Sequence, residues 1–107
     1  MIKVVYHRKY HRVTVKGHAY SGEAGKDLIC SACSILTYTL ASNVSNMEQY
    51  GQVRNMTTDL KPGDAEISCK PHSRFDAVIT MIFDSICAGF ELLANDYPEN
   101  ITYEIRG

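Results

Sequence analysis

The chain has 107 residues, of which 45% are hydrophobic and 21% charged, and its formal net charge is −1. This length suits one domain, predicted over residues 1–107, and it allows a buried core without a metal or a disulfide. The balanced charge excludes a global field that would recruit nucleic acid or an anionic membrane. Four basic residues do cluster: Arg8, Lys9, Arg12 and Lys16. Such a cluster is usually a solvated turn, and otherwise it is a surface patch that binds a partner.

No apolar stretch reaches the about 20 residues that cross a bilayer, and the N-terminus lacks a secretory signal. We therefore expect a cytoplasmic protein with reduced cysteines, no membrane contact and no cofactor. Its four cysteines include one CxxC pair, Cys30 and Cys33. A single CxxC is a weak zinc signal, so no metal site is predicted.

Alternating apolar residues predict two strands, over residues 2–6 and 13–19, joined by a polar turn near Lys9. The pattern is then interrupted by a segment with two glycines, consisting of Tyr20, Ser21, Gly22, Glu23, Ala24, Gly25 and Lys26. Because glycine is free to adopt positive φ, we expect a flexible loop here. It is either a lid over a cleft or a surface connector.

A long helix is predicted from an N-cap at Asp27 to about Met47. Its apolar residues are expected to share one arc: Leu28, Ile29, Ala32, Cys33, Ile35, Leu36, Leu40, Val44 and Met47. Cys30 is expected outside that arc, on a flank with Ser34, Thr37 and Ala41. The pattern thus separates Cys33, as core filler, from Cys30, as an accessible thiol.

The second half of the chain repeats the hairpin-then-helix order. A hairpin over residues 52–60 and 64–70, with an irregular first strand, surrounds the turn Lys61-Pro62-Gly63-Asp64. A capping box of Ser73 and Asp76 begins a second helix that ends near residue 94, and residues 101–105 form a closing strand. The order ββαββαβ predicts an α+β fold with a mainly antiparallel sheet packed against two long helices.

The second helix also carries apolar residues, Met81 and Leu92, away from its main arc. These positions exceed what a surface helix needs, which suggests a homodimer interface, although overspill from the core is the simpler alternative.

Cys30 and His18 are the candidate catalytic residues. Cys30 falls in the first turn of the predicted helix, where unpaired N–H groups and the helix dipole lower the pKa of a thiol. His18, at the end of the second strand, could act as base and acid, and the same N–H groups could stabilise an oxyanion. Asp27 could orient His18, and Ser34, one turn beyond Cys30, could hydrogen-bond near the thiol.

Two other classes of function stay open. CxxC at a helix start is also the arrangement of dithiol redox proteins, although the inward angle of Cys33 and the absence of a βαβ opening count against it. A non-catalytic ribosome- or RNA-associated module could use the basic hairpin between Arg8 and Lys16. Two further histidines, His7 and His11, flank that turn and are expected to face solvent.

The segment Gly17-His18-Ala19, followed by a glycine-bearing loop and Asp27-Leu28-Ile29-Cys30-Ser31-Ala32-Cys33-Ser34, resembles the Prp family of ribosomal-processing cysteine proteases. The resemblance implies a Cys/His dyad, matched here by Cys30 and His18, in a cytosolic homodimer that needs no nucleic acid. It implies as substrate the N-terminal extension of large-subunit ribosomal protein twenty-seven, cut after two aromatic residues during ribosome assembly. Cys33 departs from the aliphatic residue usual in the family, which fits its predicted core position.

Overall fold

The computed structural model describes residues 1–18 and 28–107. The elements are β1 (Ile2–His7), β2 (Arg12–Gly17), α1 (Leu28–Gln49), β3 (Val53–Lys61), β4 (Asp64–Pro71), α2 (Asp76–Asp96) and β5 (Ile101–Arg106). Short 3₁₀ turns occupy Arg8–Tyr10 and Ser73–Phe75. This is the predicted ββαββαβ order. Asp27 and the loop predicted over residues 20–26 lie outside the described residues.

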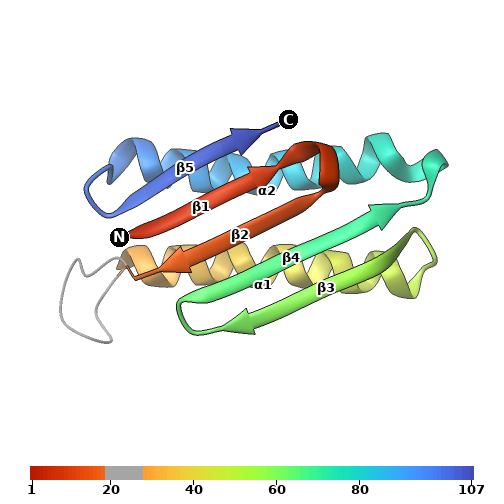
Figure 1. The fold of residues 1–107 in the computed structure, drawn as a ribbon, viewed down its shortest axis with the longest axis horizontal. Helices are drawn as coiled ribbons and strands as arrows, with labels where there is room; N and C mark the ends of the chain where they lie inside the picture. Colours follow the sequence, from red (N-terminus) through yellow and green to blue (C-terminus); the bar gives the residue numbers. More distant parts are fainter. Residues whose placement is uncertain (19–27) are drawn as a thin grey trace.

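The five strands form one sheet in the order β3-β4-β2-β1-β5. β1–β2, β2–β4 and β3–β4 are antiparallel pairs, and only β1–β5 is parallel. Both helices lie on the same face of the sheet, with α1 behind β3 and β4 and α2 behind β5 and β1 (Figure 1). The predicted α+β fold with a mainly antiparallel sheet is therefore confirmed.

The core fills the space between the sheet and the two helices. Alternate residues of each strand point into it, which is why Val4, Val13 and Ile67 are fully buried. The helices contribute the other half of the core, including Leu40 from α1 and Phe83 from α2. The opposite face of the sheet, called the open face below, carries mainly charged and polar side chains.

The second hairpin has the irregular first strand that the sequence predicts. The register between β3 and β4 shifts between Arg54 and Thr57, and Asn55 there has a positive φ of 51°. A bulge of this kind bends an edge strand. After the bulge the pairing is regular up to Lys61 opposite Asp64, so Pro62 and Gly63 make a tight two-residue turn.

The predicted buried arc of α1 is partly wrong. Leu28 and Ile35 are 81% and 65% exposed, whereas Thr37 and Ala41 are buried. The helix packs on the sheet along a stripe centred one flank away from the predicted arc, because α2 and β3 fix its rotation. Cys30 therefore lies on the buried side after all, and it stays half-exposed because it occupies the first turn of the helix.

Two predictions near α2 are also wrong. Ser73 does not cap the helix: Phe75 donates its N–H to the His72 carbonyl oxygen at 2.8 Å, forming a 3₁₀ turn, and α2 begins only at Asp76 without a side-chain cap. His11 does not face solvent, because it is only 7% exposed and its Nε2 lies 2.7 Å from Thr80 Oγ1. Burial lowers the pKa of His11, and the Asp76 carboxylate partly opposes this shift.

The sequence also led us to expect no segment suited to a membrane. By length and hydropathy, however, Leu28–Gln49 and Ser73–Asp96 could each cross one. Core helices of soluble proteins pass the same test, and both helices here bury one side against the sheet.

Candidate active site

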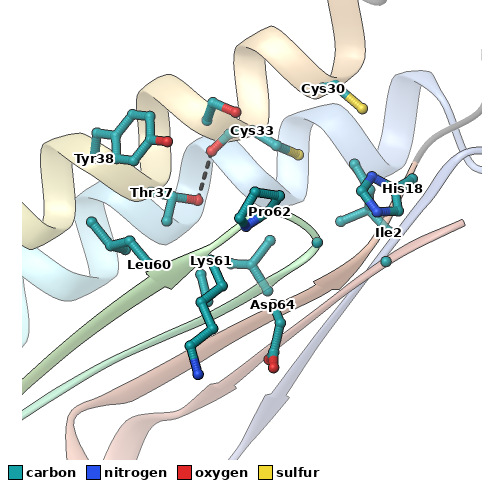
Figure 2. Close-up of a pocket in the computed structure, with 15 residues that line it drawn as sticks. Ile2, His18, Cys30, Cys33, Thr37, Tyr38, Leu60, Lys61, Pro62 and Asp64 are labelled. Atoms are coloured by element: carbon teal, nitrogen blue, oxygen red, sulfur yellow. Dashed lines mark hydrogen bonds between the residues drawn. The ribbon is translucent and has the colours of Figure 1, made fainter. Parts of the chain in front are cut away.

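A pocket of about 280 Å³ lies between the first half of α1, the end of β2 and the β3–β4 turn. His18, Cys30 and Ser34, three of the residues predicted from the sequence, all line it. Figure 2 shows this pocket, with α1 along one side and the β3–β4 turn along the other. Segments about 45 residues apart in the sequence, around His18 and Gly63, thus meet at one site.

His18 follows directly after β2, and its position depends on two glycines. Gly17 ends the strand with a φ of +96°, and its N–H donates to the Gly63 carbonyl oxygen at 2.9 Å. A side chain at Gly17 would overlap the Met1 carbonyl oxygen. Gly63 has a φ of +70°, and the His18 ring packs so closely on it that an added Cβ would lie 2.5 Å from Nε2. The β3–β4 turn therefore supports the imidazole.

Cys30 is the third residue of α1, as the sequence predicts. Its side chain is half-exposed, and its sulfur points toward the side of the pocket on which the His18 ring lies (Figure 2). The N–H groups of a helix's first turn lack intrahelical acceptors, so they can bind a negatively charged atom. A thiol, an imidazole and backbone donors thus belong to one pocket.

Cys33 and Ser34 lie in different surroundings. Cys33 is 3% exposed and belongs to the core, although one side of it reaches the pocket wall. Its carbonyl oxygen accepts a hydrogen bond of 2.7 Å from the Thr37 hydroxyl (Figure 2). Ser34 is exposed at the pocket, one helical turn after Cys30.

The far wall of the pocket was not predicted from the sequence. It consists of Tyr38 from α1 and of Leu60, Lys61 and Pro62 from the β3–β4 hairpin. The Pro-Gly turn was evident in the sequence, but nothing there indicated which end of the sheet it would reach. The pocket also holds one described carboxylate, that of Asp64, which pairs with Lys16 at 3.4 Å and points away from His18 in Figure 2.

Cys69 and Cys87 are buried. Burial raises the pKa of Cys69 to about 11 and, as the main cause, that of Cys87 to about 12. None of the four cysteines forms a disulfide. Within residues 1–18 and 28–107, no three His, Cys, Asp or Glu side chains converge as metal ligands would.

The family model for cysteine protease Prp matches residues 1–102. The chain belongs to this family. It is therefore a cysteine protease, and the pocket that contains its half-exposed thiol is the candidate active site of the protease. Comparison with curated protein sequences finds no match.

Solved structures share the fold of the protease. An essential ribosomal processing protease Prp from S. aureus, with a covalently linked product peptide, has a TM-score of 0.72 at 18% identity, covering 98% of this chain and 97% of that chain. The same S. aureus protease with a substrate peptide gives 0.65 at 18% identity, with the same coverage. SMU.848 from Streptococcus mutans also gives 0.65, at 24% identity, covering 98% and 91%.

Proposed function

We propose that Cys30 is the nucleophile of this protease and His18 its general base and acid. The observation that carries the proposal is their meeting in one pocket, with the sulfur at the start of a helix and directed toward the imidazole side. A helix N-terminus favours the thiolate, and a neighbouring imidazole can hold the proton that the thiol gives up.

The chemistry follows from this arrangement. The Cys30 sulfur attacks the peptide carbonyl carbon, and the carbonyl oxygen takes up negative charge that first-turn N–H groups of α1 stabilise. The C–N bond then breaks, the protonated His18 gives its proton to the leaving amine, and a thioester to Cys30 remains. Water attacks the thioester while His18 accepts its proton, so that the carboxylic acid product leaves and the thiol and imidazole are restored. Ser34, which lines the same pocket one helical turn after Cys30, is the proposed supporting residue.

The proposed substrate is the N-terminal extension of large-subunit ribosomal protein twenty-seven, whose removal supports ribosome assembly. Family membership and the fold shared with a ribosomal processing protease support this substrate class. The exposed Tyr38 and Leu60 at the far wall provide apolar surface for the aromatic side chains before the cleaved bond.

The direct test is cleavage of a synthetic peptide that spans the extension junction, with the products identified by mass. We expect one cut after the aromatic pair, complete loss of cleavage in Cys30→Ala, and near wild-type cleavage in the matched control Cys69→Ala. Cleavage by Cys30→Ala would refute the role of this thiol. Cys33→Ala tests the alternative of a dithiol redox protein, because a redox pair would lose its function if either cysteine were replaced.

We also propose that the protease is a cytoplasmic homodimer. Val78, Met81 and Leu92 are 48%, 65% and 64% exposed, and their spacing places them on one stripe of α2, opposite its buried side. Such a stripe is costly to leave in water and is typical of an interface. Met81→Glu is expected to halve the mass measured by light scattering, whereas Thr102→Glu, on the open face, leaves it unchanged. A monomeric wild-type protein would refute the dimer.

A further inference from the structure

A second cleft lies at the opposite end of the sheet from the active site. It has a volume of about 720 Å³ and lies where the β1–β2 connection approaches the first part of β3 and the last part of β4. Four cationic residues line it: Lys9, Arg12, Arg54 and Lys70. Along β4, Lys70 is six residues from Asp64 in the active-site pocket, or about 20 Å at the rise of a strand. This feature is called the basic cleft below.

The cations of the basic cleft come from separate strands that the sheet brings together. Arg54 and Lys70 lie directly opposite each other in the β3–β4 pair. Arg12 lies opposite both Ser68 and His7, and His7 lies opposite Arg106, so this neighbouring row carries positive residues on β2 and β5. Lys70 follows Ser68 by two residues on β4 and therefore lies on the same face of the sheet. Burial lowers the pKa of His7 first, Arg12 and Arg106 lower it further, and the Glu104 and Glu66 carboxylates oppose this shift.

Folding gives no reason for this arrangement. Like charges directly opposite each other on neighbouring strands destabilise a sheet. Lys3 and Lys16 also lie opposite each other on the open face, but there Lys16 pairs with Asp64 at 3.4 Å. The ion pairs between described residues include none with Arg12, Arg54 or Lys70. The one described carboxylate in the cleft, Asp76, lies 3.3 Å from His11 Nε2.

The shape and the remaining lining suit an extended ligand. The bulge at Asn55 bends β3 at this point, and bulges often lie beside functional sites. Tyr10 is 63% exposed at the rim, and the Lys9 ammonium group lies over its ring, 5.9 Å from the ring centre. Proteins that bind single-stranded nucleic acid combine these two elements, a cationic groove that follows the phosphates and an aromatic ring on which a base stacks.

We propose that the basic cleft binds the phosphodiester backbone of a single-stranded nucleic acid, with Arg12, Arg54 and Lys70 on phosphates and Tyr10 against a base. The carboxylates of an acidic peptide would pair with the cations, but they would not stack on the exposed ring of Tyr10 as a base does. The proposal goes beyond proteolysis and does not depend on it, because the cleft shares no lining residue with the active-site pocket.

The test measures binding of a fluorescent oligouridylate to the full-length protein at increasing salt. For three phosphate contacts the logarithm of the binding constant should fall with the logarithm of salt with a slope of about −2. The variant Arg54→Ser/Lys70→Ser is expected to bind at least tenfold more weakly at low salt, with a slope nearer −0.7. Tyr10→Ser should weaken binding while leaving the slope unchanged.

The chain offers a matched control. Lys3 and Lys16 also lie opposite each other on the open face, at the end nearer the active site, so Lys3→Ser/Lys16→Ser removes the same charge. This variant should bind as the wild type does, and Arg54→Ser/Lys70→Ser should still cleave peptide. Equal loss in both double variants would overturn the proposal in favour of diffuse attraction. Displacement by polyglutamate as effective as by unlabelled oligouridylate would overturn it in favour of an acidic protein.

Discussion

Replacing Gly63 by alanine tests whether the β3–β4 turn holds His18 in place. The new Cβ would lie 2.5 Å from Nε2 and 2.9 Å from Cε1, whereas ordinary contacts begin at 3.4 Å. The imidazole would therefore move by about 1 Å, and a displacement of that size can cost about 10²-fold in rate. We expect kcat/KM for peptide cleavage to fall by about 10- to 100-fold.

Gly51 provides the control that separates this contact from backbone strain. Its φ of +71° matches the +70° of Gly63, but an added Cβ would meet nothing within 4 Å. Alanine in the left-handed region costs about 1–2 kcal/mol at either position. Both variants should therefore lose similar stability in thermal unfolding, by about 4–8 °C per kcal/mol for a chain of this size. Only Gly63→Ala should lose activity.

The assay combines peptide cleavage with the rate at which iodoacetamide modifies Cys30 across a range of pH. A displaced imidazole should alter the pH dependence of alkylation as well as kcat, which a general loss of stability would not do. If Gly63→Ala cleaves peptide at the wild-type rate, or if Gly51→Ala is equally impaired, the support of His18 by this turn is refuted.

Three further predictions concern stability and thiol reactivity. The Tyr6 hydroxyl donates to Asp84 Oδ1 at 2.9 Å, so Asp84→Ala should cost about 1–3 kcal/mol in urea unfolding, and much less when Tyr6 is already Phe. Because burial lowers the pKa of His11, the unfolded chain binds more protons, and the free energy of unfolding should rise with pH through about 6.5. His11→Asn, which suits the φ of 49°, should flatten that rise; an unchanged slope would contradict it. Peptide mapping after brief alkylation should find label on Cys30 long before Cys69, whose pKa of about 11 keeps it protonated; equal labelling would contradict this.

The sequence by itself determined the order of the secondary-structure elements and the position of Cys30 at the start of a helix. Alternation in the strands and a hydrophobic run in each helix are short-range patterns, so they predicted ββαββαβ and the irregular course of β3. The burial of Cys33 also followed from helical spacing, but the direction of the buried stripe did not, and Cys30 is half-exposed because it lies in the first turn of α1. Leu28 and Ile35 proved exposed because the contacts of α1 with the sheet and with α2, rather than its own pattern, set its rotation.

Only the tertiary structure decided which distant residues meet. The strand order places β4 between β2 and β3, which brings the Gly63 turn against His18 and sets Lys70 and Arg54 beside Arg12. It also buried His11 against Thr80, where the sequence indicated a solvent-facing turn. Strand order and register depend on how the whole core packs, and a local pattern contains no information on contacts between segments so far apart.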